Sequence, residues 1–252
     1  MNRSIYIGIT LDIEYQPTYA REPWYALREN YCTAIQNAGG TPVCLPHAID
    51  QVDAYLDLVD GLVISGGMYD IRPELYGETD IKGGLVTKEG RTEFERRLVL
   101  GALQRDIPMI GICGGMQLIA VANGAKLIQD IPTGVKTPLE HMQPEPHDVA
   151  SHSVSFTPGT RIAQLFGAGS AEVNSVHHQS VKDIPPEILV SAVSSDRVIE
   201  AIEIPGQSFC LGFQWHPEYQ INEGESRVFR GLIEAAADYE KRVAIGEHPA
   251  VT

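Results

Sequence analysis

Short runs of apolar residues alternate with longer amphipathic stretches through the first half of the chain. Uninterrupted apolar runs are typical of strands buried on both faces, and the amphipathic stretches between them are typical of helices. This alternation predicts a parallel, doubly wound α/β sheet. The predicted strands cover 5–9, 41–45, 60–65 and 107–112, and the predicted helices run from Pro23 to Gly39, over 91–105 and over 113–123.

The second half is richer in strands and ends in a helix. Its strands are expected over 150–156, 171–176, 188–194, 197–204 and 208–214, and its helix over 223–241. Irregular stretches over 12–22, 68–90 and 132–149 are long enough to predict functional or mobile loops. No internal repeat or linker interrupts the pattern, so we expect a single domain over 1–252 with a loose tail from about 243.

Composition and charge narrow the function classes. Hydrophobic residues make up 43% of the 252 residues, which excludes disorder as the main state. With 19 Lys and Arg against 33 Asp and Glu, the net charge of −14 argues against nucleic acid and anionic membranes as partners. The four cysteines contain no CxxC pair, so neither a disulfide framework nor a cysteine zinc site is predicted. No apolar run approaches the ~18 residues of a membrane span and no signal-peptide pattern is present, so the cytoplasm is the expected location.

The strongest chemical signal is Gly111-Ile112-Cys113-Gly114-Gly115, between a predicted strand and a predicted helix. This is the pattern of a nucleophile elbow, in which glycines make room for a side chain on a tight, strained turn. The helix N-terminus after Cys113 favours its thiolate, and the N–H of Gly114 is placed to donate to an oxyanion. From these residues alone, a buried cysteine at a strand end is the alternative.

Two further signals follow predicted strands. Gln214-Trp215-His216-Pro217-Glu218 offers a base in His216 and an orienting carboxylate in Glu218, which a cysteine nucleophile requires. Ser65-Gly66-Gly67 places backbone N–H groups at the carboxyl end of a strand, where parallel sheets bind ligands. Taken singly, a His near a Glu is more often an exposed pair without a function, and two glycines more often form an ordinary turn.

Together these segments resemble the class I glutamine amidotransferase-like hydrolases, and among them the γ-glutamyl-γ-aminobutyrate hydrolase (peptidase C26) family. The resemblance covers about residues 5–240. It is carried by the three motifs above and by three further segments. Their order along the chain is 37–42, 65–67, 70–78, 111–115, 173–179 and 214–218. It implies a flavodoxin-like α/β sandwich with a mostly parallel central sheet and helices on both faces.

For the site, the resemblance implies hydrolysis of a γ-glutamyl amide through a cysteine thioester. Cys113 is then the nucleophile, His216 the acid and base, and Glu218 the group that orients His216. The N–H groups of Gly67 and Gly114 are expected to hold the oxyanion, and Gly66 is expected beside them at the oxyanion and substrate site. Substrate binding is expected at Gln117, Asn174, Ser175 and His177. No cofactor and no metal ion are expected, the partner is a small γ-glutamyl amide, and a homodimer stays open.

The prediction of where the leaving amine binds rests on less distinctive residues. Family members usually carry Arg directly after the nucleophile, and Gly114 stands there in this chain. Tyr15, Tyr19 and Trp24 are expected either to line a pocket for the amine or to cover a helix. Acidic residues nearby at 12, 14 and 22 would repel an anionic amine. We therefore expect a preference for neutral, aromatic or cationic amines over γ-aminobutyrate.

Histidines outside these motifs do not predict a metal site. His177 and His178 are adjacent on a predicted strand, so their side chains point to opposite faces. His141 and His147 lie in a Pro-rich stretch that we interpret as a solvated loop.

Two other functions stay open on this fold. One is a glutaminase subunit that supplies ammonia to a separate synthetase, and free glutamine as the best substrate would favour it. The other is a non-catalytic binding protein, against which the presence of Cys113, His216 and Glu218 weighs.

Overall fold

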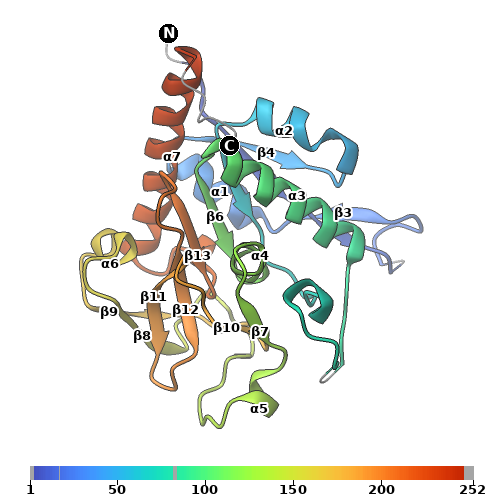
Figure 1. Cartoon of the computed structure of the whole chain (residues 1–252), viewed down its shortest axis with the longest axis vertical. Coiled ribbons are helices and arrows are strands. Elements are labelled where there is room, and N and C mark those ends of the chain that lie inside the picture. The colour runs from blue at the N-terminus through green and yellow to red at the C-terminus, as the bar shows by residue number, and fades with distance from the viewer. Residues whose placement is uncertain (1–2, 17, 82–83, 247–252) are drawn as a thin grey trace.

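A central sheet of nine strands organises the molecule in a computed structural model that describes residues 3–16, 18–81 and 84–246. Figure 1 shows the sheet with helices on both of its faces. In spatial order the strands are β4 (Thr41–Leu45), β1 (Tyr6–Thr10), β5 (Gly61–Ile64), β6 (Met109–Ile112), β13 (Cys210–Phe213), β12 (Ile199–Glu203), β11 (Leu189–Ser194), β8 (His152–Phe156) and β9 (Ser170–Val173).

The sheet has a parallel half and an antiparallel half. The strands from β4 to β13 are parallel, and those from β12 to β9 extend the sheet by antiparallel pairing. In the register of β6 and β13, Ile112 lies opposite Phe213. Because both strands run the same way, the residues that follow them, Cys113 and Gln214 to His216, leave the sheet at the same edge.

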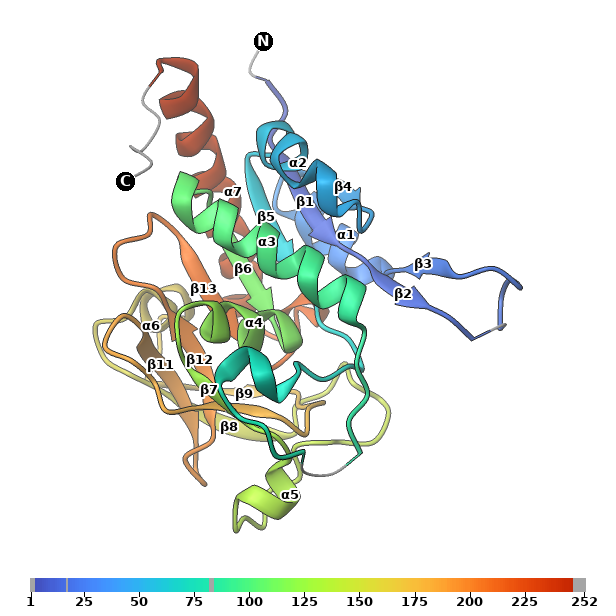
Figure 2. The same cartoon turned by 45° about the vertical axis from the view of Figure 1, so that its right-hand side comes forward.

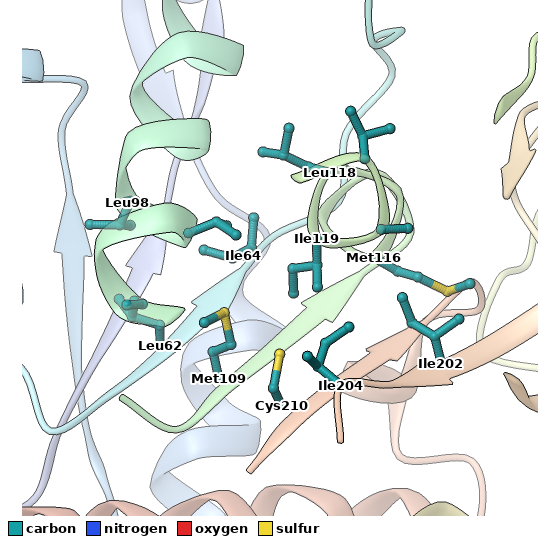
Figure 3. Packing of buried hydrophobic residues seen from close by; sticks show 14 of the residues in the cluster. Leu62, Ile64, Leu98, Met109, Met116, Leu118, Ile119, Ile202, Ile204 and Cys210 are labelled. Atoms are coloured by element: carbon teal, nitrogen blue, oxygen red, sulfur yellow. The ribbon is translucent and has the colours of Figure 1, made fainter. Parts of the chain in front are cut away.

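Two layers of helices bury the faces of this sheet. One face is covered by α2 (Val52–Leu58), α3 (Glu89–Arg105) and α4 (Gly114–Ala122), and the other by α1 (Glu29–Asn37), α6 (Arg161–Phe166) and α7 (Glu223–Ala244). In Figure 3, side chains such as Leu98, Met109 and Ile119 fill the space between the sheet and helices α3 and α4. All three are fully buried, so the elements that carry the candidate site rest on a packed core.

Smaller elements decorate the edges of the sheet. A hairpin of β2 (Asp12–Glu14) and β3 (Trp24–Ala26) projects from the body, as Figure 2 shows. A second small antiparallel pair joins β7 (Lys126–Ile128) and β10 (Ser180–Lys182). The short helices are η1 (Ile49–Gln51), η2 (Pro73–Tyr76), α5 (Ile131–Gly134) and η3 (Pro217–Tyr219).

The predicted fold class is confirmed, but several element boundaries are wrong. The helix expected from Pro23 begins only at Glu29, because Trp24–Ala26 pairs with β2 as a strand instead. The predicted strand over 171–176 ends at Val173. Helix α7 continues through Ala244, so a loose tail does not start at 243; residues 247–252 lie outside the described residues. Helices α2 and α6 and the β7–β10 pair were not predicted.

Among the described residues, no helix is both long and apolar enough to cross a bilayer.

Candidate active site

Cys113 occupies a strained turn between β6 and α4. Its backbone φ of 52° and ψ of −109° place it in a region that non-glycine residues rarely adopt. The neighbouring glycines are required by close approach, since a Cβ on Gly115 would lie 2.1 Å from the carbonyl oxygen of Ile64. A Cβ on Gly111 would lie 2.6 Å from the backbone of Gly115. The turn therefore has the geometry expected of a nucleophile elbow.

His216 and Glu218 stand beside this cysteine at the end of β13. His216 Nδ1 lies 2.7 Å from Glu218 Oε1, and the Cys113 side chain is another hydrogen-bond partner of the His216 ring. The backbone of His216 is held by Asn174, whose Oδ1 accepts from the His216 N–H at 2.8 Å. All three side chains of the Cys-His-Glu set are buried. This order of thiol, imidazole and carboxylate can activate a nucleophile and move a proton.

The charges in this set favour a protonated imidazole. Burial alone would lower the pKa of His216, but the Glu218 carboxylate and the Cys113 sulfur raise it to about 10. An imidazolium is therefore held next to the Cys113 sulfur at neutral pH, which is the environment that stabilises a thiolate.

Two backbone N–H groups near Cys113 are free to donate. Within the described residues, neither the Gly67 N–H nor the Gly114 N–H has a hydrogen-bond partner, and Gly114 starts helix α4. The Gly66 N–H differs, because it donates to the Tyr31 hydroxyl at 3.1 Å. Gly67 and Gly114, the two residues expected to donate to an oxyanion, therefore have N–H groups available in this conformation, and Gly66 lines the larger cavity with its own N–H bound.

Arg91 fixes the direction of the peptide between Gly66 and Gly67. Its guanidinium is completely buried and donates from Nη2 to the carbonyl oxygens of Ser65 at 2.9 Å and Gly66 at 3.0 Å. In a planar trans peptide the C=O and the next N–H point in opposite directions. Because Arg91 binds the Gly66 carbonyl, the Gly67 N–H points away from Arg91 and is left available for an oxyanion.

Cys113 lies where two cavities meet. A larger cavity of about 410 Å³ is lined by residues including Trp24, Arg28, Tyr31 and His216. A smaller one of about 90 Å³ is lined by residues including Gln117 and His178. Gly67, Met68, Cys113 and Val176 line both cavities. A substrate bonded to the sulfur can thus extend in two directions.

The smaller cavity carries polar groups whose positions are set by hydrogen bonds. Gln117 donates both amide hydrogens to the protein, to Gln179 O and Gln214 Oε1 at 3.1 Å each, which leaves its Oε1 as an acceptor. His178 lies 2.8 Å from Asp70, and this hydrogen bond raises the pKa of His178. The smaller cavity therefore offers an acceptor in Gln117 and an imidazole in His178 whose protonation is favoured by Asp70 and Asp130.

The other residues expected to bind substrate have structural contacts instead. Asn174 and Ser175 are fully buried and line neither cavity. Ser175 binds the segment around His141, since its N–H donates to Gln143 Oε1 and its hydroxyl to the His141 carbonyl. His177 lines the smaller cavity, but its Nδ1 is bonded to Gln179 O and its Nε2 faces Glu200. The side chains of His177 and His178 do diverge, as their adjacency predicts.

The larger cavity only partly matches the expected amine pocket. Trp24 lines it, whereas Tyr15 and Tyr19 do not and are 55% and 86% exposed. Tyr19 instead packs edge-on against Trp24, with ring centroids 5.6 Å apart. Gly114 lines the smaller cavity and not the larger one, so the Arg that it replaces would not face the amine side assumed in the sequence argument.

The expected repulsion of anionic amines is also not supported. Asp12 pairs with Lys88 at 2.8 Å and Arg91 at 2.9 Å, and Glu14 pairs with Lys88 at 2.9 Å. Although burial opposes it, these cations lower the pKa of Asp12 and offset its charge. Exposed Arg28, which forms no ion pair within the described part of the chain, adds a cation to the cavity lining.

Several site residues were given no role by sequence reasoning. Arg91 and Tyr31 belong to helices α3 and α1, and Arg28 directly precedes α1. Arg91 was noted only in Arg91-Thr92-Glu93, where the family commonly has an Arg-Asp pair, and Tyr31 and Arg28 lie in no local motif. For Asp70 and His178 a signal was present, because both belong to the segments that carry the family resemblance.

The fold and this site define a class I glutamine amidotransferase-like protein with a cysteine at the nucleophile elbow. A crystal structure of a glutamine amidotransferase from Thermotoga maritima has the same fold, with a TM-score of 0.60 over 94% of this chain and 100% of that one, at 14% identity. The chain belongs to the peptidase C26 family, whose model matches residues 6–218. It is therefore a member of a hydrolase family.

The names of its relatives point to more than one activity. The γ-glutamyl-γ-aminobutyrate hydrolase PuuD of Escherichia coli is 34% identical over 83% of this chain and 85% of its own length. The glutamine amidotransferase-like protein RP404 of Rickettsia prowazekii is 34% identical over 91% of this chain and 97% of its own length. The family is settled by these matches, and the substrate has to be argued from the site.

Proposed function

We propose that this chain hydrolyses the γ-glutamyl amide bond of a γ-glutamylated amine, releasing glutamate and the free amine through a thioester on Cys113. The observation that carries the proposal is the position of Cys113 between a small polar cavity and a larger cavity lined by Trp24. A γ-glutamyl amide has the same division, with a constant polar end and a variable amine end. The 34% identity to a γ-glutamyl-γ-aminobutyrate hydrolase supports the same substrate class.

The first half-reaction forms the thioester. The Cys113 thiolate attacks the γ-carbonyl carbon, and the carbonyl oxygen becomes an oxyanion that receives hydrogen bonds from the Gly67 and Gly114 N–H groups. His216, protonated and held by Glu218, gives its proton to the amine nitrogen as the carbon–nitrogen bond breaks. His216 lines the larger cavity, which is the side from which the amine leaves.

The second half-reaction releases glutamate. The neutral His216 takes a proton from a water molecule, and the resulting hydroxide adds to the thioester carbon. The same two N–H groups stabilise the second oxyanion. Collapse of this intermediate breaks the carbon–sulfur bond, which frees glutamate and restores the Cys113 thiolate beside an imidazolium.

Recognition of the glutamyl end is assigned to the smaller cavity. Gln117 Oε1 is an acceptor suited to the α-ammonium group, and the His178 ring, held by Asp70 and Asp130, forms another part of the lining. These contacts would be the same for every γ-glutamyl amide, whatever the amine.

Selection of the amine is assigned to the larger cavity. Trp24 and Leu27 offer apolar area to an alkyl or aryl amine, and Arg28 offers a cation to an amine that bears a carboxylate. Because Asp12, the acidic residue that lines this cavity, is paired with Lys88 and Arg91, we keep apolar size as the main selector. The charge preference is tested with Arg28→Gln, which should lower kcat/KM about threefold to tenfold for amides of carboxylate-bearing amines and leave that of the other amides unchanged.

The proposal is tested by kcat/KM on a panel of γ-glutamyl amides with alkyl, aryl, polyamine and γ-aminobutyrate leaving groups, with free glutamine in the same assay. We expect at least one amide to exceed glutamine by tenfold or more, since glutamine leaves the larger cavity unfilled. Glutamine as the best substrate would instead favour the glutaminase subunit. No turnover of any member, together with slow alkylation of Cys113, would favour a binding protein.

A further inference from the structure

A buried cluster of histidines and one carboxylate lies next to the substrate wall and has no part in the reaction proposed above. It consists of His141, His152, His177 and Glu200, which are 3%, 7%, 4% and 0% exposed. His152 begins strand β8, Glu200 lies on β12, and the other two lie in irregular segments. His141 was expected in a solvated loop, and that expectation is wrong because Asp196 binds its ring inside the protein.

Three ring nitrogens converge on one oxygen of the carboxylate. Glu200 Oε1 lies 3.2 Å from His152 Nε2, 3.4 Å from His141 Nδ1 and 3.8 Å from His177 Nε2. Nitrogen and oxygen ligands about 2.1 Å from a tetrahedral metal ion are separated from one another by about 3.4 Å. The ligand atoms of His141, His152 and Glu200 all lie within 4.8 Å of one another, as expected for three ligands of one ion, and His177 Nε2 lies beside them, 3.8 Å from Glu200 Oε1.

The hydrogen bond on the far side of the His177 ring leaves a lone pair facing this oxygen. His177 Nδ1 lies 2.9 Å from the Gln179 carbonyl, which can only accept, so Nδ1 carries the hydrogen and Nε2 is a lone pair. His141 Nε2 donates to the Asp196 carboxylate at 2.9 Å, and its Nδ1 faces Glu200 Oε1, so a proton or a metal ion on Nδ1 is stabilised by both carboxylates. Both of these nitrogens are buried without a hydrogen-bond partner, as is Glu200 Oε2.

His152 Nε2 donates to Glu200 Oε1 at 3.2 Å, and buried imidazole nitrogens around a carboxylate are stabilised when a positive charge, from a proton or a metal ion, lies among them. The nearly buried side chain of Asp196, which binds His141, adds a second negative charge next to the cluster. Imidazoles oriented by a carboxylate or a carbonyl on their second nitrogen are the usual arrangement of metal-binding histidines. Mixed imidazole and carboxylate ligands in a tetrahedral array are typical of zinc.

We propose that His141, His152 and Glu200 bind one divalent transition-metal ion of the zinc type, with the His177 Nε2 lone pair beside it, as a structural site. The ion would join strands β8 and β12 to the segment that carries His141, next to the segment that carries His177. His177 follows Val176, whose carbonyl oxygen lies 3.7 Å from Cys113 Sγ and which lines both cavities. The site would thus hold the wall of the cavities in place without contact with the substrate.

The test measures metal binding and does not depend on turnover. The wild-type protein is stripped with a chelator, its accessible thiols are alkylated with iodoacetamide, and it is titrated with Zn²⁺ and, separately, Co²⁺. Alkylation keeps Cys113, and the pair Cys32 and Cys44, which lie next to each other, from holding the ion. We expect one Zn²⁺ per chain, a rise in Tm on binding, and the intense visible absorption of tetrahedral Co²⁺.

Variants locate the ion. His152→Gln should abolish stoichiometric binding, and Asp196→Asn, which changes a group that orients His141 without removing a ligand, should weaken it about tenfold to a hundredfold. His147→Gln is the matched control, because His147 lies six residues from His141 outside the cluster, and its binding should equal wild type. The proposal is overturned if the wild-type protein binds no stoichiometric metal ion. It is also overturned if His147→Gln and Asp196→Asn bind the ion equally well, and this comparison can be made even if His152→Gln fails to fold.

Discussion

The two cavities that meet at Cys113 are built in different ways. In the smaller cavity, Gln117 and His178 are fixed by hydrogen bonds to buried groups of the protein. In the larger cavity, Trp24 and Leu27 are half-buried and Arg28 is exposed, next to a hairpin that projects from the body. A rigid polar side suits the constant end of a substrate series, and an open apolar side suits the variable end. The chemistry between them should accordingly be independent of the amine.

The largest effect should come from the residue shared by both cavities. Cys113→Ala should reduce kcat by at least about a thousandfold on every amide in the panel, because no other group can form the thioester. Trimming a side chain at this turn should leave the fold intact. Cys44→Ser, at an exposed cysteine, is the control and should retain wild-type kcat. Substantial turnover by Cys113→Ala would remove the basis of the mechanism.

Glu218→Gln should cost less and should change the pH dependence. In the wild type the pKa of His216 is about 10, so the imidazolium is present at neutral pH and is lost only as the pH rises through that value. Removing the carboxylate charge lowers this pKa, so the alkaline limb of kcat/KM should move to lower pH, with a loss on the order of a hundredfold at neutral pH. An unchanged alkaline limb would mean that another group sets it.

Arg91→Lys tests whether the oxyanion turn is set from outside. A lysine keeps the charge but cannot bind the Ser65 and Gly66 carbonyls in the same fixed plane. We expect kcat to fall about tenfold to a hundredfold with little change in KM, equally for all amines. Arg96→Lys on the same helix, where Arg96 is paired with Glu93 on the surface, should have no effect. A change in KM alone would place Arg91 in substrate binding.

Trp24→Ala should have a smaller effect than the Cys113, Glu218 and Arg91 variants, and, unlike theirs, its effect should depend on the amine. The kcat/KM for aryl and alkyl amides should fall about tenfold, as expected for one lost apolar contact, while that for free glutamine should stay nearly constant. Tyr19→Ala should have a weaker effect in the same direction, because Tyr19 touches Trp24 and not the cavity. A uniform loss across all substrates would show that the two sides of Cys113 are not separate.

The parts of the molecule that could be predicted from the sequence are those whose determinants are local. The elbow around Cys113 needs only glycines at fixed spacing, and His216 and Glu218 are two residues apart. Arg91 could not be predicted in the same way, because the carbonyls that it binds lie on a different element, 25 and 26 residues away.

The failures have the same physical origin. Pro23 is compatible with a helix start, but pairing of the following residues with Asp12–Glu14 decides in favour of a strand. His141 has the polar, Pro-rich surroundings of a solvated loop, and its burial is decided by Asp196, 55 residues further along the chain. Asn174 and Ser175 lie in a motif segment, yet they bind backbone groups of other segments and do not face the cavities.

The thioester is the central claim, and mass spectrometry tests it most directly. Wild-type enzyme is mixed with two γ-glutamyl amides that differ in their amine, quenched rapidly in acid, and digested, and the peptide that contains Cys113 is weighed. The account predicts that both substrates add one glutamyl unit to Cys113, with the same mass, and that hydroxylamine removes it as γ-glutamyl hydroxamate. Turnover without any adduct on Cys113, or an adduct whose mass follows the amine, would contradict it.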